Sequence, residues 1–62
     1  MTQLEFQNKI ANDYPHTNEE INKILELSYQ FDENRLNEIY QIIYDDETIY
    51  PTIIEVIEYL SI

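Results

Sequence analysis

Apolar side chains recur along this chain at the three- and four-residue spacing of amphipathic helices, and they divide it into four short segments. In the first segment, residues 2–12, Phe6 and Ile10 lie four positions apart and predict a helix. The run DYPH at 13–16 ends this helix, because a residue before proline avoids helical backbone angles and Pro15 has no amide hydrogen to donate.

The second segment has the clearest helical signal. Thr17 and Glu20 have the spacing of a capping box, in which two side chains accept hydrogen bonds from free backbone amides at a helix N-terminus. Residues at helical spacing follow the box and predict one apolar face, which consists of Ile21, Ile24, Leu25, Ser28 and Tyr29.

A third helix is predicted after Phe31, where the second helix ends. Asp32 is a natural N-cap, and Glu33 lies in the first turn, where the helix dipole favours an anion. The predicted apolar face of this helix consists of Leu36, Ile39, Tyr40 and Ile43.

The last segment follows a polar connector, DDET at 45–48. Pro51 suits the first position of a helix, where a missing amide hydrogen costs nothing. Ile54, Ile57 and Leu60 then follow at helical spacing. These features predict a fourth helix from Pro51 onward.

The same segment also has features of a strand, because β-branched residues are frequent and Ile53, Glu55 and Ile57 alternate in polarity. The helix is favoured, since Glu55 and Glu58 are three positions apart and share one helical face. We therefore predict an all-α fold, a small bundle of three or four short helices, with a terminal strand as the alternative.

The length of 62 residues predicts one domain, residues 1–62, about 27 Å across. A chain this short buries only about 60% of the surface that its unfolded form exposes, so its stability is modest. A second copy would enlarge the core, and a homodimer is therefore one of the expected forms.

The composition excludes several classes of protein. Without glycine the chain has no P-loop, dinucleotide-binding turn or EF-hand, and without cysteine it has no zinc finger, thiolate nucleophile or disulfide. The longest uncharged run, residues 48–54, is too short to span a membrane, and residues 1–12 do not resemble a signal peptide. These features favour a cytoplasmic protein.

Catalytic and metal-binding residues are scarce. His16 is the only imidazole, and no nucleophile has a spacing that would pair with it. Asp45, Asp46 and Glu47 could attract a hard cation, but consecutive carboxylates point in different directions and no glycine provides a coordinating turn. We expect no enzyme activity, no bound metal and no cofactor.

Acidity is the most unusual feature, with thirteen Asp and Glu against three Lys and Arg and a formal charge of −10. Direct binding to nucleic acid or to anionic lipid needs positive charge and is not expected. A DNA duplex about 27 Å long carries about 16 phosphates, about eight of them on one face. The carboxylates match this density if they gather on one side, which predicts mimicry of DNA; the alternative is that they only confer solubility.

The six tyrosines divide into two groups. Those on or beside the apolar stripes are expected to pack in the core with the hydroxyl at its boundary, namely Tyr29, Tyr40 and Tyr59. Those at segment ends among acidic residues are candidates for a protein interface, namely Tyr14, Tyr44 and Tyr50.

Three stretches of the chain place leucine-like and acidic residues in a shared helical pattern: INKILEL at 21–27, DENRLNEIY at 32–40 and IEVIEYL at 54–60. In them the chain resembles the middle helical part of the ArdA-type antirestriction proteins. Members of that family are acidic, elongated, dimeric mimics of DNA that block type I restriction–modification enzymes. The resemblance implies a phage or mobile-element product that disarms a host defence protein.

We therefore predict a DNA-mimic inhibitor that binds a host DNA-binding protein or enzyme. The family has further domains on either side of this region, so a Cas nuclease, a uracil-DNA glycosylase or a polymerase is an alternative target. A small interaction module that regulates a transcription factor is a second alternative. The residues expected to bind the partner are Glu19, Glu20, Glu26, Asp32, Glu33, Glu38, Asp45, Asp46, Glu47, Glu55 and Glu58, with Tyr44 and Tyr50 as aromatic anchors.

Overall fold

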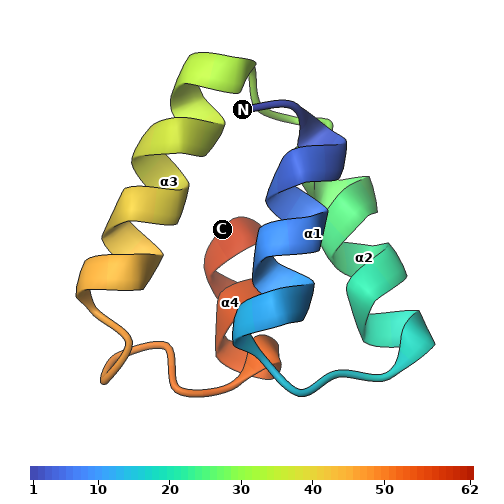
Figure 1. The fold of residues 1–62 in the computed structure, drawn as a ribbon, viewed down its shortest axis with the longest axis vertical. Coiled ribbons are helices and arrows are strands. Elements are labelled where there is room, and N and C mark those ends of the chain that lie inside the picture. Colours follow the sequence, from blue (N-terminus) through green and yellow to red (C-terminus); the bar gives the residue numbers. More distant parts are fainter.

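The computed structural model describes residues 1–62, and its only regular elements are helices (Figure 1). The four helices are α1 (Gln3–Asp13), α2 (Asn18–Ser28), α3 (Glu33–Asp45) and α4 (Ile53–Leu60). The predicted all-α class is confirmed, and the last segment is a helix rather than a strand. None of the four is both long enough and apolar enough to cross a bilayer.

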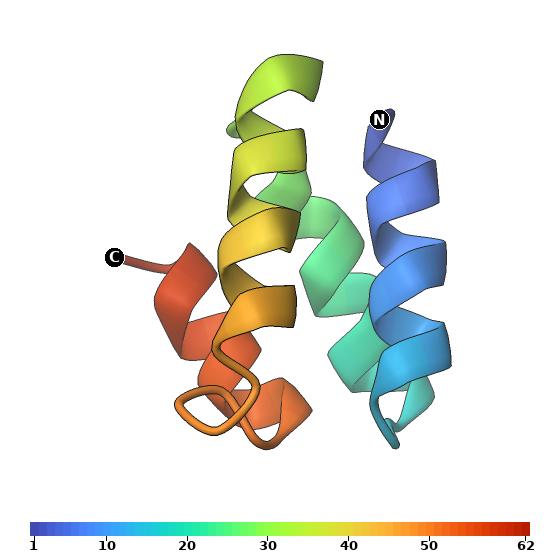
Figure 2. The ribbon, with the colours of Figure 1, turned by 60° about the vertical axis from the view of Figure 1, so that its left-hand side comes forward.

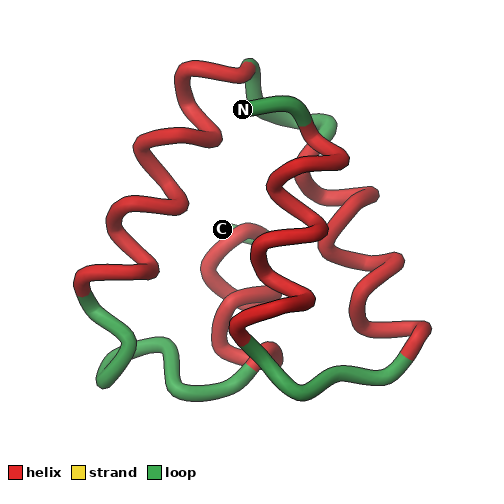
Figure 3. Tube along the Cα trace, in the orientation of Figure 1, coloured by secondary structure: helices red, strands yellow, loops and turns green.

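Successive helices alternate in direction, so the connecting loops fall at two ends of the molecule (Figures 1 and 3). The α1–α2 and α3–α4 loops lie at one end, and the α2–α3 loop and the N-terminus lie at the other. Helix α1 packs against α2 and α3, and α2 packs against α4, whereas α3 and α4 have few direct contacts. The Cα trace extends 24 × 24 × 22 Å, close to the expected diameter.

Each helix begins after a side chain that accepts a hydrogen bond from its first turn, and these capping residues are Thr2, Thr17, Asp32 and Thr52. The predicted Thr17–Glu20 capping box is confirmed, with N–O distances of 3.2 and 2.8 Å. The prediction that Pro51 opens the last helix was wrong. Thr52 is the N-cap and α4 begins at Ile53, because the Thr52 hydroxyl satisfies a backbone amide that Pro51 cannot.

Eleven buried apolar side chains form the core, and they come from all four helices and the residue that follows α1: Phe6, Ile10, Tyr14, Ile24, Leu27, Leu36, Ile39, Ile43, Ile53, Val56 and Leu60. The predicted apolar face of α4 was correct at Leu60, but Ile53 and Val56 are buried where Ile54 and Ile57 were expected. Ile53 is 3% exposed, whereas Ile54 is 54% exposed. Apolar residues surround most of α4, so its periodicity alone could not show which side packs against α2.

Two of the predictions for tyrosines were wrong. Tyr29, expected in the core, is 68% exposed because α2 ends at Ser28 and the chain turns there. Tyr14, expected at an interface, is only 5% exposed and belongs to the core. Tyr40 and Tyr59 are half-buried against the core, as expected.

Candidate functional site

Six of the thirteen carboxylates lie at the end of the bundle that holds the α1–α2 and α3–α4 loops (Figure 1). Asp13 and Asp45 are the last residues of α1 and α3, Glu19 and Glu20 lie in the first turn of α2, and Asp46 and Glu47 follow α3 in the loop. We call these six carboxylates the acidic end. No lysine or arginine occurs in residues 10–22 or in residues 36–62. His16 is therefore the only side chain in the two loops that can become positive.

The two loops meet at a pair of prolines between the carboxylates. Asp13 and Glu47 line one open hollow of about 370 Å³ together with Pro15 and Pro51. Glu20 lines the next hollow, which shares both prolines. Carboxylates from α1, α2 and the α3–α4 loop are thus brought together from distant parts of the sequence.

Hydrogen bonds from two tyrosines fix this end of the molecule. The Tyr14 hydroxyl donates to the backbone oxygen of Tyr50 at 2.8 Å and ties α1 to the α3–α4 loop. The Tyr40 hydroxyl donates to Oδ2 of Asp13 at 2.7 Å and ties α3 to α1. The loop is also closed by backbone amides, since those of Ile49 and Tyr50 donate to the carbonyl of Asp46. The carboxylates therefore stand on a braced framework.

The pKa values of both tyrosines reflect their surroundings. Burial raises the pKa of Tyr14, and the charges of Glu47 and Asp13 raise it further. Burial and the hydrogen bond to Asp13 raise the pKa of Tyr40 to about 12. Both hydroxyls therefore remain protonated donors at neutral pH.

The negative charges at the ends of α1 and α3 are unfavourably placed. A helix carries partial negative charge at its C-terminus, where lysine or arginine is stabilising and a carboxylate is not. Asp13 and Asp45 are nevertheless the last residues of these helices, and no basic residue lies in the last turn of any helix. The interaction of these two charges with the helix dipoles is unfavourable, although each carboxylate accepts a hydrogen bond, Asp13 from Tyr40 and Asp45 from Gln41.

Glu55 lies in the first turn of α4, next to the α3–α4 loop. The remaining carboxylates predicted to bind a partner lie away from the acidic end, and they are Glu26, Asp32, Glu33, Glu38 and Glu58. Two of them have a cationic neighbour: Glu26 lies 3.8 Å from the Lys23 ammonium, and Glu38 lies 3.0 Å from the Arg35 guanidinium. The Asp32 carboxylate accepts a hydrogen bond from the backbone amide of Arg35 and caps α3.

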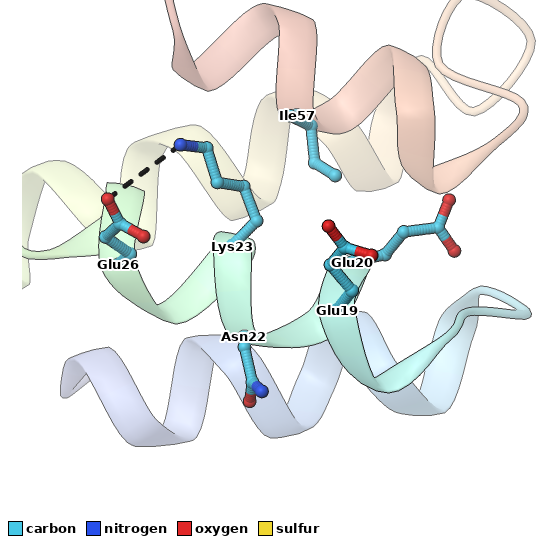
Figure 4. Close-up of a pocket in the computed structure, with 6 residues that line it drawn as sticks. All are labelled: Glu19, Glu20, Asn22, Lys23, Glu26 and Ile57. Carbon is cyan, nitrogen blue, oxygen red and sulfur yellow. Dashed lines mark ion pairs between the residues drawn. The ribbon is translucent and has the colours of Figure 1, made fainter.

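An open hollow between α2 and α4 contains both kinds of charge (Figure 4). Glu19, Glu20 and Glu26 line it from α2, and Ile57 faces them from α4. Lys23 lies between the carboxylates and pairs with Glu26. The lysine offsets part of the negative charge here, and three glutamates against one lysine leave the hollow negative.

The two aromatic residues predicted as anchors differ in accessibility. Tyr44 is exposed, and its ring stacks on Tyr40 with the centroids 6.2 Å apart. It lies directly before Asp45, so it is available beside the acidic end. Tyr50 is half-buried, with its ring edge-on to Tyr59 at 4.9 Å. Tyr50 therefore supports the fold more than it offers a free surface.

The side chains that could perform catalysis are engaged elsewhere or isolated. The Nδ1 atom of His16 lies 2.9 Å from the carbonyl oxygen of Tyr14. The hydroxyls of Ser28 and Ser61 donate to backbone carbonyls of their own helices. No three carboxylate or imidazole groups converge closely enough to hold a metal ion. What the geometry offers is a negatively charged surface at the acidic end.

Sequence analysis overlooked Asp13 as a member of this surface. It was assigned only to the break between two helices, and its position as the last residue of α1, opposite Glu47, depends on how the loops pack.

Comparisons of the chain with protein-family models, with curated proteins and with solved structures found no match.

Proposed function

We propose that this protein is a DNA-mimic inhibitor whose acidic end occupies the nucleic-acid-binding groove of another protein. The observation that carries the proposal is the gathering of six carboxylates from three helices and a loop, with no lysine or arginine in the two loops. A basic groove that normally binds phosphates would attract such a surface over long distances and would lose that attraction as salt is added.

The density of charge is comparable with that of DNA. A duplex as long as this molecule, 24 Å, carries about 14 phosphates, of which about seven face one side. The six carboxylates of the acidic end approach that number within one end of the bundle. Charge that served only solubility would need no such concentration.

The unfavourable position of two carboxylates, Asp13 and Asp45, at helix C-termini supports the same function. Sequences depart from the local rules of stability most often where a binding site requires it. Asp13 and Asp45 oppose the dipoles of α1 and α3, and no cation compensates them. A basic partner would supply the missing positive charge.

The resemblance to the ArdA-type proteins makes a type I restriction–modification enzyme the first target to test. A Cas nuclease and a uracil-DNA glycosylase are the next two, because a single small module can fill one groove without the length of the family's DNA-like surface. In each case the expected result is competition with DNA for the same groove.

The test is displacement of a fluorescent DNA duplex from each purified enzyme, followed by anisotropy at low and at high salt. We expect the protein to displace DNA at low salt and much less at high salt. The variant D45N/D46N/E47Q should displace DNA at least about tenfold less effectively, because each lost charge contact contributes to binding.

A matched control is the variant E26Q/E33Q/E38Q, which removes the same number of charges outside the acidic end. It should displace DNA almost as well as the unmodified protein. Equal loss in the two triple variants would show that only net charge matters. Failure of the unmodified protein to displace DNA from any of the three enzymes would contradict the proposal.

A further inference from the structure

A second surface runs along α4, from the α3–α4 loop to the first half of α3. Figure 2 shows α4 beside the lower half of α3, joined to it by the α3–α4 loop. Two adjoining hollows of about 180 and 200 Å³ share Tyr59 and Ile62. We call these hollows the α3–α4 groove, and the rest of its apolar lining consists of Phe31, Ile39, Ile49 and Tyr50.

The groove exposes apolar side chains that no part of this chain covers. Ile49 is 60% exposed, and Ile62 is also exposed. Phe31, Tyr50 and Tyr59, which also line the groove, are only partly buried. Covering these side chains would be favourable, because apolar surface would leave water.

The charges around the groove indicate what kind of partner would cover it. Glu55 and Glu58 line it directly beside Ile49 and Ile62. Arg35, at the other end, is already paired with Glu38 at 3.0 Å. The net charge beside the groove is therefore negative, which favours a basic partner.

A second copy of this chain is poorly matched to the groove. Each copy has a formal charge of −10, and pairing through α4 would bring Glu55 and Glu58 of both copies close together. Like charges brought close together in an interface oppose association. A basic segment of another protein has no such penalty.

We propose that the α3–α4 groove binds an amphipathic helix of another protein, with an apolar face and lysine or arginine beside that face. An apolar groove along a helix suits another helix, which places apolar residues one turn apart into it. The molecule has no sheet edge to which an extended strand could be added. This inference goes beyond the proposed function and does not depend on it, because the apolar side chains of the groove, and not the carboxylates of the acidic end, would hold the partner.

The probe is a fluorescent synthetic peptide of about five helical turns, with leucine at helical spacing on one face and lysine on the other. A scrambled peptide of the same composition controls for charge. At physiological salt we expect the helical peptide to bind the protein at least about fivefold more tightly than the scrambled one, measured by anisotropy.

Two isoleucines of similar exposure give a matched pair of variants. Ile49 lines the groove, whereas Ile54, 54% exposed, lines a hollow beside Pro15 and Pro51. Ile49→Ser should weaken peptide binding about fivefold, and Ile54→Ser should change it by less than about twofold. Circular dichroism establishes that both variants keep their helices.

Three outcomes would overturn the inference: equal binding of the two peptides, equal weakening by the two variants, or a dimer in sedimentation that Ile49→Ser dissociates. The last outcome would assign the groove to a second copy. Displacement of DNA by the acidic end should be unaffected by Ile62→Ser, because Ile62 lines both hollows but follows α4 at the end away from the α3–α4 loop. Failure of the groove to bind the peptide is therefore distinguishable from failure of the proposed function.

Discussion

The two ends of the bundle use the same acidic residue types for different purposes. At the end that holds the α2–α3 loop, Asp32 caps α3, and Glu38 pairs with Arg35 within the first turns of that helix. At the acidic end, Asp13 and Asp45 stand at the negative ends of α1 and α3 without a cation. Asp32 and Glu38 thus stabilise α3 near its N-terminus, whereas the charges of Asp13 and Asp45 oppose the dipoles of α1 and α3.

This difference teaches that net charge alone does not identify a binding surface. A carboxylate that caps a helix or pairs with an arginine is accounted for by folding. Asp13 and Asp45 accept hydrogen bonds from neutral side chains but pair with no cation, so the charge of each opposes its helix dipole without compensation. The proposed binding to a basic protein would supply that compensation. Substitutions at the two ends of the bundle are therefore expected to have different effects on stability.

The largest expected effect concerns two tyrosines, one at each end. Tyr14 is 5% exposed and braces the acidic end, whereas Tyr29 is 68% exposed beside the α2–α3 loop. Tyr14→Ala should lower the free energy of unfolding by about 3 kcal/mol, because it leaves a cavity and an unpaired carbonyl. Tyr29→Ala should lower it by less than about 0.5 kcal/mol. Urea unfolding followed by circular dichroism measures both, and similar values would contradict the described core.

The next effect is a dependence on alkaline pH through the Tyr40–Asp13 hydrogen bond. The pKa of Tyr40 rises from 10.0 to about 12 in the folded protein. Between these values the unfolded chain releases this proton and the folded protein keeps it, so the free energy of unfolding falls as pH rises.

Tyr40→Phe removes that hydroxyl and keeps the ring beneath the Lys9 ammonium, which lies 5.4 Å from its centroid. The variant should be less stable than the unmodified protein near neutral pH, and the difference should shrink between pH 10 and 12. Thermal unfolding across this range measures it. A constant difference would show that the hydroxyl does not titrate as described.

The smallest expected changes in the free energy of unfolding have opposite signs at the two ends of the bundle. Asp32→Ala should lower the free energy of unfolding by about 1 kcal/mol, because α3 loses its N-cap. Asp45→Asn should raise it by about 0.5 kcal/mol, because a charge that opposes the dipole of α3 is removed. The asparagine oxygen can still accept the hydrogen bond from Gln41, so the comparison isolates charge. Destabilisation by Asp45→Asn would refute the unfavourable placement of this carboxylate.

Local signals predicted the helices well where a cap and a one-sided pattern agreed. The Thr17–Glu20 box and the Asp32 cap were recognised because capping depends on residues three positions apart. The phase of α4 was not recognised, because isoleucine occurs at both Ile53 and Ile54 and only packing against α2 decides which one is buried. Tyr14 was misplaced for a similar reason, since its burial depends on the distant α3–α4 loop.

The helical class, the caps and the excess of negative charge could be predicted from the chain, because they depend on composition and on neighbours within one turn. Which carboxylates share a surface depends on how the helices pack. Asp13, Glu20 and Glu47 are far apart along the chain, and they meet because alternating helices bring two loops to one end. The apolar lining of the α3–α4 groove also depends on tertiary structure, because Ile49 from the loop and Ile62 after α4 are brought into the same hollow.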